Sequence, residues 1–269
     1  MGGTNLKAGL VNRESISKIT STAVNNQASR ELVLDQLFSI TDQLMNVHIK
    51  GIGIGVPGLV DEKEGIVYDV INIPSWKEIA LQKIMEERYK LPVFINNDAN
   101  CFVLGEYYFG KGKGFNSMIG LTIGTGLGAG IIINKKLYTG ANCGAGEFGM
   151  VQYLDKFYEY YASGQFFKNI YNMDGETVFK NAKQSHENAL HMYSEFGNHL
   201  GNAINMIMYT YDPPLIILGG SVRYAWPYFQ ERMWQQIRTF AYSRSVEHLQ
   251  IMSSDLENSG ILGAAALHF

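Results

Sequence analysis

Cysteines, charged residues and long hydrophobic runs are all scarce in this chain, and each shortage excludes a class of protein. The 269 residues include two cysteines, Cys101 and Cys143, which are too few for a disulfide scaffold or a four-thiolate zinc site. No apolar run reaches the roughly 20 residues that a membrane helix needs. The first residues also lack the apolar stretch of a signal peptide. These absences predict a soluble, cytoplasmic protein with no membrane partner.

The low charge content excludes a further class of partner. Charged residues make up 17% of the chain, below the roughly 25% of typical soluble proteins. Lysine and arginine number 22 against 25 aspartates and glutamates, a net charge of −3. Without a basic excess, nucleic acid is not an expected partner. Hydrophobic residues reach 46%, enough for a sizeable core, and the length favours two domains over one large domain.

Glycine, in contrast, is abundant, with 29 residues in clusters that indicate tight turns near a ligand. Apolar runs predict strands at 6–11, 51–56, 92–96, 117–123, 130–134 and 215–218. Amphipathic or small-residue segments predict helices at 29–47, 77–89, 100–109, 189–209, 227–240 and 260–267. This alternation of strand and helix indicates α/β layers with some parallel pairing.

Two glycine-rich segments have the character of phosphate-binding turns. The first is Gly2-Gly3-Thr4 with Lys7 close behind, and the second is Gly124-Thr125-Gly126 between two predicted strands. Such turns bring backbone N–H groups against phosphate oxygens, although each is also compatible with an ordinary turn. Neither is a Walker A loop, and the strand-like segment 131–134 does not suit a dinucleotide-binding loop.

Polar residues follow the predicted strand 92–96 as Asn97, Asp98 and Asn100. Loops at the carboxyl ends of strands bind ligands in α/β sheets, so Asp98 could act as a general base and Asn97 could hold a hydroxyl. The alternative is that both cap the following helix. Glu147, among glycines, suits either a sugar ligand or a solvated turn. Gly219-Gly220 could admit a flat ring or simply stop a strand.

The order of these motifs along the chain is more specific than any one of them. The Gly-Gly-Thr turn is followed by GIGIGVPGLVD (51–61), INNDANC (95–101), LTIGTGLGAGIIINKKLYTGANCGAGEFG (121–149) and DPPLIILGGS (212–221). This series resembles the ROK family of sugar kinases and repressors over essentially the whole chain. The resemblance implies an α/β, actin-like ATPase (ribonuclease H-like) fold with two α/β domains flanking a cleft. It predicts a smaller domain of residues 1–115 plus 256–269 and a larger one of 116–255.

The resemblance also implies an ATP-dependent kinase that phosphorylates a hexose, with glucose as the first choice. Asp98 matches the family's catalytic base, and Asn97 and Glu147 match ligands of the sugar hydroxyls. For the nucleotide, the resemblance assigns three groups of residues. Gly2, Gly3, Thr4 and Lys7 match the first phosphate loop, Gly124, Thr125 and Gly126 match the second, and Gly219 and Gly220 match the segment that borders the adenosine. With Mg²⁺, these groups are a sufficient set for phosphoryl transfer. Residues around Gly58 and at 72–76 are expected to select the sugar.

One departure from the family pattern concerns zinc. Many members follow the Glu-x-Gly turn with a histidine and a Cys-rich zinc loop, but Met150 stands at the histidine position and residues 151–164 contain neither Cys nor His. Zinc needs nitrogen or sulfur ligands, so we expect none. EYYASG (159–164) still resembles the segment after that loop, which keeps Glu159 as a sugar ligand. Aromatic packing is expected to replace the metal through Tyr153, Phe157, Tyr158, Tyr160 and Tyr161.

A second departure concerns the first strand. Family members carry D-x-G-G-T after an apolar strand, and here Met1 stands at the x position. That aspartate helps to place Mg²⁺ and phosphate. We therefore expect little kinase activity from a polypeptide that begins at Met1, and restored activity when an upstream segment ending in Asp is added.

The missing aspartate and the missing zinc loop keep a second function open. The alternative is a regulatory protein of the same family that binds sugar without phosphoryl transfer. A DNA-binding repressor would further need a helix-turn-helix extension before the phosphate loop. The resemblance also implies a homodimer.

Overall fold

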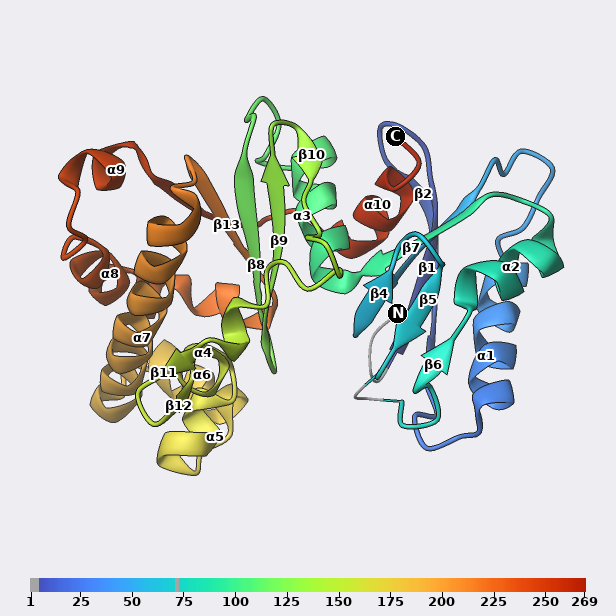
Figure 1. The fold of residues 1–269 in the computed structure, drawn as a ribbon. Coiled ribbons are helices and arrows are strands. Elements are labelled where there is room, and N and C mark those ends of the chain that lie inside the picture. The colour runs from blue at the N-terminus through green and yellow to red at the C-terminus, as the bar shows by residue number, and fades with distance from the viewer. Residues whose placement is uncertain (1–4, 71–72) are drawn as a thin grey trace. The chain divides into compact units, whose positions relative to one another are not determined.

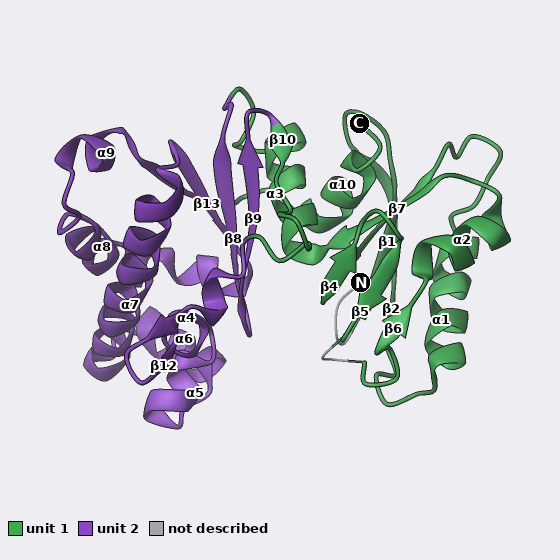
Figure 2. Ribbon diagram, viewed as in Figure 1, with its two compact units in different colours: residues 1–114, 136–145, 255–269 green, residues 115–135, 146–254 purple. Residues whose placement is uncertain are grey.

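The computed structural model describes residues 5–70 and 73–269, and the chain divides into two compact units (Figure 2). Unit 1 comprises Met1–Gly114, Lys136–Ala145 and Asp255–Phe269, and unit 2 comprises Phe115–Lys135 and Gly146–Ser254. The division expected from the sequence has nearly the same main boundaries but assigns residues 136–145 to the larger domain. In the structure this segment holds the short strand β10 (Lys136–Leu137) and groups with unit 1.

Unit 1 is built on three small sheets (Figure 1). An antiparallel pair joins β1 (Asn5–Val11) to β2 (Ile16–Ala23). A parallel pair joins β3 (Ile52–Val56) to β7 (Val93–Asn97). The third sheet is antiparallel and contains β4 (Leu59–Asp61), β5 (Ile66–Tyr68) and β6 (Glu78–Ile79). The carboxyl end of β7 leads directly into the polar segment at residues 96–100.

The helices of unit 1 are α1 (Arg30–Asp42), α2 (Leu81–Tyr89), α3 (Asp98–Phe109) and α10 (Ser259–Ala266). Ser29 is the N-cap of α1, and its hydroxyl accepts a hydrogen bond from the Leu32 N–H, as Ser at this position commonly does. Its buried residues Val33, Leu37 and Ile40 recur at helical spacing and join the core of the unit. α10 lies alongside α3 (Figure 1), so the last helix of the chain packs on the helix that follows β7.

Unit 2 contains strands in the order β9-β8-β13-β14. The strands are β8 (Met118–Ile123), β9 (Leu127–Ile133), β13 (Leu215–Gly219) and β14 (Gln250–Ser253). β8 and β9 form an antiparallel hairpin, whereas β13 runs parallel to both β8 and β14. Every residue of β13 is buried, as the continuous apolar run 215–218 predicts for a strand covered on both faces.

The remaining elements of unit 2 are mostly helical. A two-stranded hairpin is formed by β11 (Gln152–Tyr153) and β12 (Lys156–Phe157). Two short 3₁₀ helices are η1 (Phe148–Met150) and η2 (Ser221–Ala225). The α-helices are α4 (Tyr158–Ala162), α5 (Phe166–Tyr171), α6 (Gly175–Lys183), α7 (Glu187–Tyr211), α8 (Trp226–Ile237) and α9 (Ser243–His248).

The structure differs from the expected elements at several points, among them β6 and β2. The helix expected at 77–89 begins only at Leu81, because Glu78 and Ile79 pair with β5 as the strand β6. Strand β2, which the sequence analysis did not predict, is mostly exposed and therefore lacks a buried face to reveal it. Among the helices of residues 5–70 and 73–269, none has both the length and the apolar character needed to cross a membrane.

Candidate functional site

The end of β7 passes directly into α3, and this corner carries Asn97 and Asp98 in unit 1. Asn97 is the N-cap: its Oδ1 accepts the Ala99 N–H at 2.8 Å. Its Nδ2 donates to the Gly58 carbonyl at 3.0 Å. The cap expected from the sequence is therefore present, and it does not exhaust the side chain, since an amide makes up to four hydrogen bonds. The Asn97 side chain is thus fixed in place and keeps capacity for a ligand hydroxyl.

A buried polar network holds this corner from behind. The Asn96 side chain is buried, and its Oδ1 accepts the Asn97 N–H and an Asn100 amide hydrogen, both at 2.8 Å. Its Nδ2 donates to Glu62 Oε1 at 2.9 Å. Buried amides are costly unless paired, so this network specifies the local backbone. Asn96 and Asn100 belong to the INNDANC motif (95–101), but the motif indicates no role for either residue. Nothing in the sequence around Glu62 indicates that it belongs to this site.

Asp98 is the first residue of α3, and its side chain is exposed. Burial raises the pKa of its carboxyl above the usual range, although the backbone N–H groups of Ala99 and of Asp98 itself oppose the shift. Asp98 is nonetheless exposed, so its carboxyl reaches solvent. The carboxylate is therefore accessible to an incoming hydroxyl and more basic than an ordinary aspartate.

The glycine turn of unit 2 joins β8 to β9. Within it the Gly124 N–H donates to the Gly126 carbonyl at 3.0 Å, and Thr125 is exposed at its tip. The turn is held by the segment after α4: Ser163 Oγ donates to the Thr125 carbonyl at 3.0 Å, and the Gly164 N–H donates to the Gly124 carbonyl at 2.7 Å. These two hydrogen bonds engage carbonyl groups of the turn. They are therefore compatible with backbone N–H groups of the turn binding an anion.

Gly219 and Gly220 lie beside this turn. β13 runs parallel to β8 with Gly219 opposite Thr122, so both strands end at the same edge of the sheet. Gly220 has φ of +77°, and a Cβ there would lie 2.2 Å from the Ile123 carbonyl oxygen. Only glycine fits this position without displacing the backbone. The structure thus brings together, at carboxyl strand ends, two segments that the sequence analysis assigned to the nucleotide.

The two candidate glutamates of unit 2 differ in how firmly they are held. Glu159, in α4, is half-buried, and its Oε2 accepts the Leu127 N–H at 2.9 Å, directly after the glycine turn. Glu147 is exposed and precedes η1, where its carbonyl accepts the Met150 N–H at 3.1 Å. Gly149, two residues after Glu147, packs against Glu159, since a Cβ there would lie 3.3 Å from Glu159 Cβ. η1 also contacts α4, so the backbone segments that carry the two glutamates are neighbours in unit 2.

The candidate residues are divided between the two units. Unit 1 holds Gly58, Asn97, Asp98 and the exposed Lys7, which lies on β1 opposite Ser21. Gly2, Gly3 and Thr4 lie outside the described residues. Unit 2 holds the other seven candidates, Gly124, Thr125, Gly126, Glu147, Glu159, Gly219 and Gly220.

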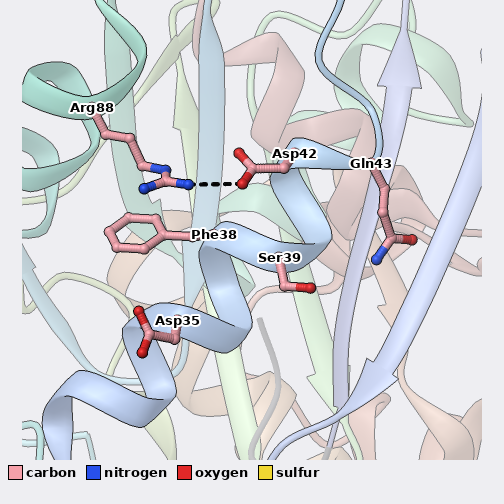
Figure 3. Close-up of a pocket in the computed structure, with 6 residues that line it drawn as sticks. All are labelled: Asp35, Phe38, Ser39, Asp42, Gln43 and Arg88. Atoms are coloured by element: carbon pink, nitrogen blue, oxygen red, sulfur yellow. Dashed lines mark hydrogen bonds and ion pairs between the residues drawn. The ribbon is translucent and has the colours of Figure 1, made fainter.

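A separate hollow of 510 Å³ on unit 1 is lined by Asp35, Phe38, Ser39, Asp42, Gln43 and Arg88 (Figure 3). Arg88 pairs with Asp42 at 2.8 Å, and its guanidinium lies 4.4 Å from the Phe38 ring centre. The Tyr89 hydroxyl donates to Asp42 at 2.7 Å and holds the pKa of that carboxyl below its usual range. These contacts join α1 to α2. The hollow contains none of the candidate residues, and we assign it no ligand.

Metal content is a direct test of the zinc expectation. Within residues 5–70 and 73–269, no group of three or more His, Cys, Asp or Glu side chains is placed to hold a metal ion. We predict that the purified protein carries far less than one zinc per chain, as measured by inductively coupled plasma mass spectrometry after dialysis. One stoichiometric zinc would contradict the prediction.

Comparison with known proteins relates this geometry to a family. The family model described as "ROK family" matches residues 1–269. A glucokinase from Thermotoga maritima is 27% identical over 99% of this chain and 95% of the relative. A xylose repressor from Bacillus subtilis is 28% identical over 90% of this chain and 67% of the relative.

A solved structure supports the same relationship. The ROK family glucokinase from Streptomyces griseus, in complex with glucose and AMPPNP, superposes with a TM-score of 0.84 at 27% identity, over 99% of this chain and 96% of that one. The predicted fold class is confirmed, because the chain has the α/β, actin-like ATPase fold of these sugar kinases. The family match spans the whole chain, so the protein belongs to the ROK family.

Proposed function

We propose that the protein is an ATP-dependent kinase that phosphorylates a hexose, with glucose as the first candidate. The observation that carries the proposal is Asp98, an accessible carboxylate of raised pKa directly after the fixed side chain of Asn97. The glucokinase relatives, one of them solved with glucose and AMPPNP, support the same substrates. The proposal includes a cytoplasmic homodimer without a nucleic-acid partner.

In the proposed reaction Asp98 takes the proton from one sugar hydroxyl. The hydroxyl oxygen then bonds to the γ-phosphorus of ATP, while the bond from that phosphorus to the β,γ-bridging oxygen breaks. The products are a sugar phosphate and ADP, and the proton remains on Asp98 until solvent removes it. Asn97, Glu147 and Glu159 hold the other hydroxyls. Gly58 contributes by fixing Asn97 through its carbonyl.

The residues of unit 2 fit a nucleotide. A Cβ at Gly124 would find no described heavy atom within 4 Å, so one side of the glycine turn is open to a ligand. Gly124, Thr125 and Gly126 would hold phosphates, with Lys7 and the turn at Gly2, Gly3 and Thr4 as the second phosphate group, and Gly219 and Gly220 would border the adenosine. Mg²⁺ supplies charge neutralisation on the phosphates when bound.

The test is ADP release with a panel of sugars. We expect ATP-dependent ADP release with at least one of glucose, mannose, fructose and N-acetylated hexosamines, together with formation of the corresponding sugar phosphate. A chain extended upstream by an apolar segment ending in Asp is assayed in parallel. If neither chain releases ADP with any sugar, the kinase proposal is wrong.

A sugar-binding regulatory protein is the second candidate, and the similarity to a xylose repressor favours it specifically. Isothermal titration calorimetry separates the two. Heat of sugar binding without ADP release would assign the regulatory function, whereas binding accompanied by turnover assigns the kinase.

A further inference from the structure

The helix that carries Glu159 is too short to be stable by itself. α4 spans five residues, Tyr158–Ala162, and isolated helices shorter than about 12 residues are marginal in water. The position of the Glu159 carboxylate must therefore be imposed by what packs against α4. The inference below rests on the proposed role of Glu159 as a sugar ligand.

On one side α4 is bound to the glycine turn. Glu159 accepts the Leu127 N–H, and Ser163, directly after the helix, donates to the Thr125 carbonyl. A Cβ at Gly126 would lie 2.6 Å from Glu159 Oε2, so the carboxylate lies directly against the turn. A small displacement of α4 would therefore move Glu159 relative to the turn that we assign to phosphate.

On the other side α4 packs on the β11–β12 hairpin and on α7. The Tyr153 and Tyr158 rings are stacked with centres 4.4 Å apart and planes 13° apart. The Tyr161 ring lies 5.0 Å from the His199 ring, and its hydroxyl donates to Asp155. Tyr158 and Tyr161 are both buried. The expected aromatic packing thus includes Tyr153, Tyr158 and Tyr161 around a histidine that the sequence analysis did not connect to them.

A chain of polar contacts runs through this packing. The Tyr153 hydroxyl lies 3.1 Å from His199 Nδ1, and His199 Nε2 lies 3.8 Å from Glu195 Oε1. Glu195 Oε2 in turn accepts the Tyr171 hydroxyl at 2.5 Å. Burial lowers the pKa of His199 below its usual range, and the neighbouring Glu195 opposes this only in part. In a neutral ring with its proton on Nε2, Nδ1 accepts from the Tyr153 hydroxyl, and the Nε2–H faces Glu195 at a distance longer than a direct hydrogen bond.

The residues present do not fit the zinc that the family resemblance implies for this region. Residues 151–164 offer tyrosine and carboxylate oxygens but no sulfur or imidazole donor. His199 comes from a different element and already contacts Tyr153 and Glu195. We propose that the Tyr153–His199–Glu195 chain is the positioning device for α4: it holds Glu159 against the glycine turn and so does the work that a bound metal ion would otherwise do.

The test compares Tyr153→Phe and His199→Phe with matched controls. Tyr242 is an exposed tyrosine of the same unit and His191 is an exposed histidine of the same helix, so Tyr242→Phe and His191→Phe remove the same groups elsewhere. Each test variant loses a hydrogen bond behind the sugar ligand, and we expect the KM for the sugar to rise about tenfold. kcat should change less than about twofold, and the controls should match the parent protein.

Two further measurements separate a positioning role from a merely structural one. His199→Asn keeps an acceptor near the Nδ1 position, and it should restore most of the sugar affinity that His199→Phe loses. Hydrogen exchange followed by mass spectrometry should show faster exchange at residues 158–164 and at Leu127 in Tyr153→Phe and His199→Phe, but not in the controls.

The exchange measurement needs no catalytic activity, so the two proposals can fail separately. Absence of turnover in the parent protein overturns the kinase proposal and leaves the exchange result standing. Unchanged exchange at 158–164, or a loss in kcat as large as the loss in sugar KM, overturns the positioning role of the Tyr153–His199–Glu195 chain.

Discussion

Asp98→Asn is expected to slow turnover by roughly a hundredfold to ten-thousandfold while leaving sugar binding nearly intact. Asparagine keeps the size of the side chain and its place at the start of α3, but it cannot accept the hydroxyl proton. The ligands that we assign to the sugar, Asn97, Glu147 and Glu159, remain in place. The measurement is kcat from ADP release together with the Kd for the sugar from calorimetry.

The control for this variant is Asp35→Asn. Asp35 is an exposed aspartate of α1 in the same unit, and it lines the hollow of Figure 3, whose lining includes no candidate site residue. We expect turnover within about twofold of the parent protein, since surface substitutions cost little. Comparable kcat values for Asp98→Asn and the parent protein would remove Asp98 from the catalytic role.

The pH dependence of the reaction gives an independent reading of the same carboxyl. Burial raises the pKa of Asp98, and only the ionised form accepts a proton. Turnover should therefore be present above the raised pKa and be lost as pH falls through it. The acid limb should lie at higher pH than for an ordinary aspartate, whose pKa is about 3.9. This limb should be absent from the residual activity of Asp98→Asn.

The sequence predicted the elements whose signals are local. The parallel strands β3 and β7 follow from short apolar runs, and β13 follows from an apolar run closed by Gly219-Gly220. The corner at Asn97 was also predictable, because a cap and a strand end are properties of a few adjacent residues. The capping alternative is confirmed for Asn97, which caps α3, whereas the role of Asp98 as a general base stays a prediction.

The sequence did not predict contacts that only the fold creates. Tyr153 and His199 are 46 positions apart and meet because α7 packs on α4. No local sequence pattern around His199 indicates a tyrosine partner. The bond from Asn96 to Glu62 spans 34 positions. The helix prediction is wrong for Glu78 and Ile79, because these residues pair with β5. Their strand conformation is set by a neighbouring strand rather than by their own propensity.

Gly263→Ala is expected to destabilise the protein by about 3 kcal/mol, the upper end of the usual cost of overpacking. A Cβ at Gly263 would lie 1.6 Å from the Cys101 carbonyl oxygen on α3, and backbone cannot rotate aside as a side chain would. The small residues of 260–267 predict such close packing. Unfolding followed by circular dichroism should show a Tm lower by roughly 6 to 12 °C.

The same helix supplies the control, because a Cβ at Gly260 would find no described heavy atom within 4 Å. Gly260→Ala should leave the Tm unchanged or raise it, since alanine is the better helix former. α3 begins at Asp98, so forcing α10 away from α3 should also displace the proposed base. Gly263→Ala should therefore lower kcat at temperatures where the protein remains folded, whereas Gly260→Ala should not. Equal Tm values for the two variants would show that the α10–α3 contact yields to a methyl group.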